Sequence, residues 1–115
     1  MRIRMLPFAL LAALVALSLA PAASPRATGT TVTVTMKEFK FTLSKSSVPA
    51  GAVTFKLVNK GAIAHDFKIG GKKSPLVAKG GTGTLTVTLK AGSQTYLCTV
   101  PGHAAGGMKG TLTVK

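Results

Sequence analysis

The chain closes with the run Tyr96-Leu-Cys-Thr-Val-Pro-Gly-His-Ala-Ala-Gly-Gly-Met-Lys-Gly110, which is followed by the alternating residues Thr111-Leu-Thr-Val114. Cys98, His103 and Met108 are spaced as C-x4-H-x4-M. A Pro-Gly pair precedes the histidine and a Gly-Gly pair precedes the methionine, and such pairs are typical of turns. The stretch therefore predicts a strand, then a loop that carries a thiol, an imidazole and a thioether, then a second strand.

Apolar and polar residues alternate with a period of two in this stretch and in four stretches upstream of it. The alternation occupies residues 31–36, 39–43, 53–57, 84–89 and 111–114. Valine and threonine at this density favour strands with one buried face, and glycine-containing turns lie between them. About seven short strands in this length predict an all-β fold, an antiparallel sandwich of two sheets. In the long connection 71–83, we expect Leu76 and Val77 to hold the loop against the core edge.

The loop residues are the ligand types of a blue-copper centre, in which two histidines and one cysteine form a plane and a methionine lies on the axis. The chain has one cysteine and two histidines, so His65 is the other available imidazole. We therefore expect one copper ion, Cu2+ or Cu+, at His65, Cys98, His103 and Met108. Simpler interpretations stay open: a buried or intermolecularly bridged cysteine, a hydrogen-bonded core histidine at position 65 and a methionine that only packs.

The N-terminus predicts export. Arg2 and Arg4 precede an apolar run from Met5 to Ala20, and small residues follow, as in a secretory signal peptide, which we assign to residues 1–23. An uncleaved anchor is the alternative, although the run is shorter than the roughly 20 residues that span a bilayer. We expect a soluble periplasmic or extracellular protein, with a disordered lead-in at 24–29 and one domain at 30–115.

The C-terminal third resembles the cupredoxins, a blue-copper family that includes plastocyanin, azurin and rusticyanin. The family pattern aromatic-x-Cys-x-x-Pro-Gly-His-x-x-x-Gly-Met-x-Gly-x-Leu-x-Val is matched by Tyr96, Cys98, Pro101, Gly102, His103, Gly107, Met108, Gly110, Leu112 and Val114. The resemblance implies a Greek-key β-sandwich of about seven to eight strands, with copper at one end. It also implies three ligands from this loop and one from an upstream strand, here Cys98, His103, Met108 and His65.

Two further roles are expected around the site. The family usually has asparagine after the upstream histidine, whereas this chain has Asp66. A carboxylate there can accept backbone N–H groups from the ligand loop, and its charge favours the oxidised metal; a solvated aspartate is the alternative. We expect the electron port at the exposed edge of His103, because a small apolar rim allows brief docking. The rim comprises Pro101, Gly102, Ala104 and Ala105.

Two functions fit such a site. The first is a soluble exported type 1 copper protein that carries single electrons between redox partners by Cu(II)/Cu(I) cycling. The second is a copper-binding protein for delivery, storage or resistance, which would favour exposed methionine or histidine clusters, whereas only Met36 and Met108 follow the signal peptide. An enzyme is not expected, because a catalytic multi-histidine copper site lacks ligands and a two-copper site lacks a second cysteine.

The chain is strongly basic. Without Arg2 and Arg4 it keeps 13 lysines and arginines against Glu38 and Asp66, a net charge of 13 − 2 = +11. Such a charge steers a protein towards acidic redox partners, such as a cytochrome or a membrane oxidase or reductase, or towards an anionic membrane surface; solubility or adaptation to an acidic medium are the alternatives. Nucleic acid is not expected, because aromatic stacking platforms are missing. We expect a monomer.

Overall fold

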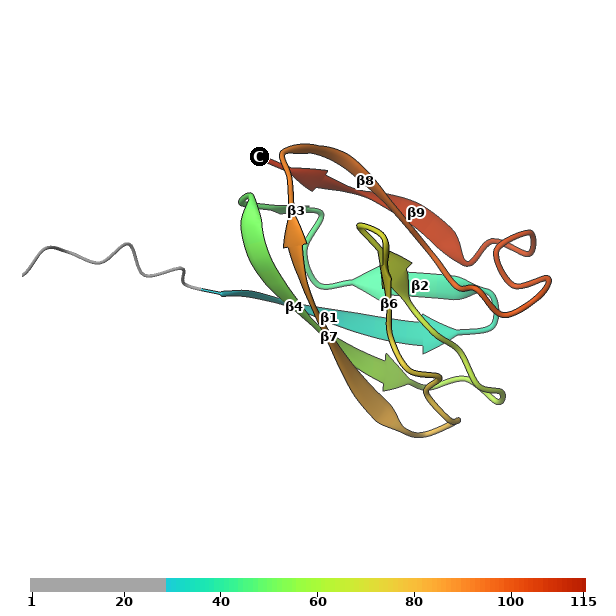
Figure 1. Ribbon diagram of the computed structural model, residues 1–115. Coiled ribbons are helices and arrows are strands. Elements are labelled where there is room, and N and C mark those ends of the chain that lie inside the picture. Colours follow the sequence, from blue (N-terminus) through green and yellow to red (C-terminus); the bar gives the residue numbers. More distant parts are fainter. Residues whose placement is uncertain (1–28) are drawn as a thin grey trace, which may run out of the picture.

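The computed structural model describes residues 29–115, which form strands and no helix (Figure 1). The strands are β1 (Thr30–Lys37), β2 (Lys40–Leu43), β3 (Ser47–Val48), β4 (Gly51–Asn59), β5 (Lys68–Ile69), β6 (Lys72–Lys73), β7 (Thr82–Leu89), β8 (Gly92–Leu97) and β9 (Lys109–Val114). The all-β prediction is confirmed. Within the described part of the chain, no helix is long and apolar enough to cross a membrane. The expected signal peptide, 1–23, and residues 24–28 of the expected lead-in lie outside the described residues.

The strands form two sheets, with the orders β2-β1-β4-β7 and β3-β9-β8-β5-β6. Most neighbours are antiparallel, but β1 pairs with β4 and β3 pairs with β9 in parallel. These two pairs differ from the expected antiparallel sandwich. After β2 the chain leaves the first sheet, contributes β3 to the second and returns as β4, and this excursion brings β4 beside β1 in the same direction.

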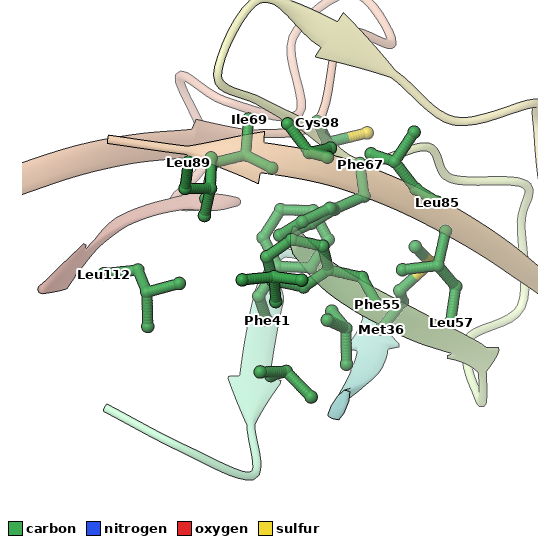
Figure 2. Close-up of a cluster of buried hydrophobic side chains, with 14 of the residues drawn as sticks. Met36, Phe41, Phe55, Leu57, Phe67, Ile69, Leu85, Leu89, Cys98 and Leu112 are labelled. Atoms are coloured by element: carbon green, nitrogen blue, oxygen red, sulfur yellow. The ribbon is translucent and has the colours of Figure 1, made fainter. Parts of the chain in front are cut away.

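The core lies between the sheets because the apolar residues of each alternating strand share one face. Val32, Val34 and Met36 of β1 are fully buried, and so are Val53, Phe55 and Leu57 of β4. The ring centroid of Phe67 lies 5.3 Å from that of Phe41 and 5.0 Å from that of Phe55. Figure 2 shows these three aromatic residues at the centre of the cluster, which also includes Cys98 and Met108. The cysteine and methionine of the loop are therefore part of the core.

The connection 71–83 is held by one of its two expected anchors. Val77 is buried, and its backbone pairs with that of His65. Leu76 is 63% exposed, so its predicted role in holding the loop to the core was wrong. Because neighbouring residues in an extended segment point to opposite sides, the pairing that turns Val77 inward turns Leu76 outward.

Three connections lie at one end of the sandwich: the β1–β2 turn, the β4–β5 connection and the β8–β9 loop (Figure 1). The β4–β5 connection contains His65, and the β8–β9 loop contains Cys98, His103 and Met108. This topology brings together chemistry-bearing residues that are more than 30 positions apart in the sequence.

Candidate metal centre

His65 is fixed by its own backbone. Its N–H donates to the carbonyl of Val77 at 3.1 Å and its carbonyl accepts from the N–H of Val77 at 2.8 Å. The buried Asn59 supports the same connection, since its Nδ2 donates to the carbonyls of Ile63 and Val77 and its Oδ1 accepts from the N–H of Gly61, each at 2.9 Å. The His65 side chain is fully buried as a result.

The β8–β9 loop folds tightly around its own three candidate ligands. The N–H of Cys98 donates to the carbonyl of Met108 at 3.0 Å, and the N–H of Met108 donates to the carbonyl of His103 at 3.1 Å. Gly102, with φ +82°, and Gly107, with φ +120°, adopt left-handed conformations that other residues rarely adopt. The glycines of the motif therefore let a short loop bring the three side chains towards the core.

His65, Cys98 and His103 form a buried cluster. Their ligand atoms lie within 4.8 Å of one another. His65 Nδ1 lies 3.0 Å from His103 Nδ1, and Cys98 Sγ lies 3.6 Å from His103 Nδ1. Because metal–nitrogen and metal–sulfur bonds of this kind are about 2.0–2.3 Å long, one ion can contact all three atoms. A thiol and two imidazoles in the same buried space are a donor set that fits copper or zinc.

Met108, the fourth expected ligand, lies in the same loop as Cys98 and His103. Its side chain is fully buried, and its backbone joins Cys98 to His103 through the hydrogen bonds described above. The thioether as an axial ligand stays a prediction.

The cysteine is held as a thiol in the metal-free protein. Burial raises the pKa of Cys98, and the negative charge of Asp66 acts in the same direction, while backbone hydrogen bonds oppose them. A metal ligand must be the thiolate, so metal binding has to release this proton. Affinity for a metal ion therefore rises with pH.

Asp66 contacts the ligand loop. Its Oδ1 accepts the backbone N–H of Thr99 at 2.6 Å, and its Oδ2 accepts the Thr99 hydroxyl. The carboxylate is 4% exposed, so it is not the solvated aspartate of the alternative interpretation.

Glu38, in the β1–β2 turn, was not among the candidate site residues. Its Oε1 accepts the backbone N–H groups of Ala62 at 2.8 Å and Ile63 at 3.0 Å and lies 3.1 Å from His65 Nε2. Hydrogen bonds from its own backbone N–H, then from those of Ile63 and Ala62, and then from His65 lower the pKa of Glu38 to about 2, against the opposing effect of burial. The one available signal was its rarity, because the chain has two acidic residues in total.

Phe39 is a second residue that the sequence did not reveal. Its ring packs edge-on against His103, with ring centroids 5.2 Å apart at 73°. His103 is only 7% exposed, whereas Phe39 is 45% exposed. The expected port residues Pro101, Gly102 and Ala105 are exposed and Ala104 is half-buried. Little of the His103 edge reaches the surface, and Phe39 belongs to the rim that surrounds it.

Comparison with known protein families agrees with this fold and this donor set. Residues 7–114 match the family model of the cupredoxin-like domain. The chain belongs to the cupredoxin-like family. This assignment accounts for the sandwich with a buried thiol and two imidazoles at one end.

Solved structures of auracyanins resemble about three quarters of the chain. An auracyanin from the photosynthetic bacterium Roseiflexus castenholzii, reduced with dithionite, is 26% identical, with a TM-score of 0.66 over 76% of this chain and 98% of its own. Auracyanin A, a blue copper protein from Chloroflexus aurantiacus, is 24% identical, with a TM-score of 0.61 over 76% of this chain and 99% of its own. Auracyanin B is also 24% identical, with a TM-score of 0.62 over 75% of this chain and 88% of its own. The last two likenesses show the fold alone. No curated protein matches the chain.

Proposed function

We propose that this cupredoxin is a type 1 copper protein that carries single electrons between redox partners. The proposal rests above all on the buried cluster of Cys98 Sγ and the Nδ1 atoms of His65 and His103. Cys98, His65, His103 and Met108 would hold the copper, and the bound ion would supply a one-electron Cu(II)/Cu(I) couple. The match to the cupredoxin-like family model and the likeness to the 26% identical auracyanin support the assignment.

The rigidity of the site favours electron transfer over copper delivery. The loop ligands are tied by backbone hydrogen bonds, and all three cluster residues are buried. A site that hardly rearranges suits electron exchange, because little reorganisation accompanies each step. A delivery protein has to open its site to release the ion, and the exposed methionine or histidine cluster that would help is absent from residues 29–115.

Three exposed apolar side chains lie on the segments that adjoin the site. Among the described residues, the exposed large apolar side chains are Phe39, Ile63 and Leu76. Phe39 packs on His103, Ile63 donates its N–H to Glu38, and Leu76 adjoins the partner of His65. We propose that these three side chains form one apolar patch which, together with Pro101, Gly102, Ala104 and Ala105, is the docking surface for a redox partner.

Positive charge lies beside this patch. A pocket of about 290 Å³ is lined by Lys37, Lys40 and Lys60 together with Thr35 and Thr42, next to the turn that carries Phe39. We propose that the preferred partner is an acidic redox protein, with an association rate that falls as salt screens these lysines. The signal-like N-terminus supports a further proposal, that both act outside the cytoplasm.

The experiment that separates a carrier from a delivery protein compares electron exchange and copper exchange in two portions of one preparation. The Cu(II)-loaded protein is mixed with a reduced c-type cytochrome and, separately, with a metal-free copper chaperone. A carrier oxidises the cytochrome rapidly and keeps its copper through repeated cycles. Rapid loss of copper to the chaperone with slow oxidation of the cytochrome would contradict the proposal.

A further inference from the structure

Glu38 has an unusual partner for an acidic residue in so basic a protein. The chain has 15 lysines and arginines and only two acidic residues. Among residues 29–115, the one contact between a carboxylate and a basic side chain is that of Glu38 with His65, and no lysine is involved. The side chain leaves the β1–β2 turn and reaches the β4–β5 connection, where it contacts three groups. This arrangement calls for an explanation other than surface charge pairing.

The hydrogen bonds of Glu38 define which nitrogen of His65 carries the proton. Oε1 accepts two backbone N–H groups, from Ala62 and Ile63, so this oxygen is not a hydroxyl and can only accept from His65 Nε2. Nε2 therefore bears the hydrogen. In the neutral imidazole, Nδ1 is then bare, and its lone pair faces His103 Nδ1 in the cluster with Cys98.

We propose that Glu38 is a positioning residue for the metal ligand His65, because its carboxylate fixes the Nε2–H tautomer and the ring orientation that leave Nδ1 free for copper. Buried imidazole ligands generally donate their other N–H to such a partner, and the loss of that partner typically costs about 10–100-fold in metal affinity. The consequence for copper rests on the proposed function, whereas the tautomer is a property of the metal-free protein.

Gly61 provides the space for this contact. A Cβ at position 61 would lie 2.5 Å from Oε1 and 2.9 Å from both Cδ and Oε2 of Glu38. The backbone of Gly61 is not in the left-handed region, so alanine fits there without backbone strain. The flexible carboxylate would have to move instead. Gly61→Ala thus disturbs the contact with His65 while Glu38 itself is kept.

Three variants separate the effect of the contact between Glu38 and His65 from the effect of the negative charge of Glu38. Glu38→Ala removes the contact, Gly61→Ala displaces it, and Glu38→Gln keeps an oxygen acceptor of similar shape without the charge. Ala91→Lys is the control, since it also makes the net charge more positive by one but lies in the exposed turn after β7, at the far end of the sandwich. Thermal unfolding of each metal-free variant reports whether it folds.

The first readout is the ¹⁵N spectrum of the imidazoles in the metal-free protein. We expect His65 to be protonated at Nε2 in the parent, the control and Glu38→Gln, and to become a mixture of tautomers in Glu38→Ala and Gly61→Ala. Should Glu38→Ala fail to fold, Gly61→Ala carries the test. This readout decides the role of Glu38 even if the protein binds no copper, an outcome that would contradict only the proposed function.

The second readout is copper binding. We expect Cu(II) affinity to fall about 10–100-fold in Glu38→Ala and Gly61→Ala, with the affinity partly recovered in Glu38→Gln. If the affinity for Cu(II) falls tenfold relative to the affinity for Cu(I), the one-electron reduction potential rises by about 59 mV. If Glu38→Ala and Gly61→Ala shift only the melting temperature, and leave the tautomer, the affinity and the potential as in the parent, Glu38 is merely structural and the inference is wrong.

Discussion

The backbone N–H of Thr99 donates to the carboxylate of Asp66 at 2.6 Å, and each of these residues directly follows a candidate ligand, Cys98 and His65 respectively. The Thr99 hydroxyl donates to the second oxygen of the same carboxylate. This pair of hydrogen bonds joins the two segments that supply the metal site. The distance between the thiol and the upstream imidazole is therefore set by a contact outside the ligands themselves.

Removing the Asp66 carboxylate should loosen the site. Asp66→Ala leaves the part-buried N–H of Thr99 without its partner, which costs about 1 kcal/mol of unfolding free energy, the lower end of the range for an unpaired polar group. Asp66→Asn keeps an acceptor and should retain most of the stability, while its lost negative charge raises the reduction potential. Chemical denaturation and voltammetry of both variants check this. Equal stability in parent and alanine variant would show that the contact does not brace the site.

Met108 should tune the potential more than it holds the metal. Met108→Leu keeps a buried apolar side chain of similar volume, so the fold should lose less than about 1.5 kcal/mol. Loss of the weak axial thioether favours Cu(I), and the potential should rise while the cysteine-to-copper absorption persists. Voltammetry and absorption spectroscopy measure both effects. An unchanged potential would place the thioether away from the metal.

Because of Glu38, we expect the folding stability of the metal-free protein to fall in acid. The pKa of Glu38 is lowered from 4.5 to about 2 in the folded chain, so folding favours the ionised form. The stability that it contributes is fully present above pH 4.5 and is lost as the pH falls towards 2. The parent should thus lose more stability than Glu38→Gln between these values. Denaturant titrations at several pH values test this, and parallel curves would contradict it.

Phe39 should control access to His103. Phe39→Ala removes the ring that packs edge-on against the imidazole and takes a 45% exposed apolar side chain from the proposed docking patch. We expect weaker binding of an acidic redox partner and slower electron transfer to it, with the absorption spectrum kept. Leu76→Ala is the matched comparison. It removes apolar area from the same proposed patch, next to Val77, which pairs with the backbone of His65, but it removes no ring that packs on His103. Identical rates in parent and Phe39→Ala would exclude the ring from the docking surface.

Local pattern was sufficient for much of the fold. The apolar residues that alternate with threonine in β1, β4 and β7 face the core as predicted, and the threonines lie on the other face. β8 was not among the alternating stretches, because the residues of Gly92–Leu97 are exposed or half-buried and show no apolar period of two. The parallel pairing of β1 with β4 depends on the path of the chain through β3, a long-range feature that periodicity does not encode.

The candidate ligands could be proposed from sequence because cysteine and histidine are rare in this chain and three of the four lie in one short motif. The structure brings His65, Cys98 and His103 together. Glu38 and Phe39 could not be foreseen, since their role depends on how the β1–β2 turn lies over the histidines. Asn59 was also missed, because a buried amide that caps a connection resembles any turn asparagine in sequence.

The role of Cys98 as a copper ligand is tested by the visible and electron-spin resonance spectrum of the protein after one equivalent of Cu(II), recorded beside that of Cys98→Ser. We expect an intense blue thiolate-to-copper absorption and a narrow copper hyperfine splitting in the parent, both lost on reduction with ascorbate and regained on reoxidation. Cys98→Ser should show neither feature. A colourless parent, or a serine variant that is still intensely blue, would contradict the assignment of Cys98 as a copper ligand.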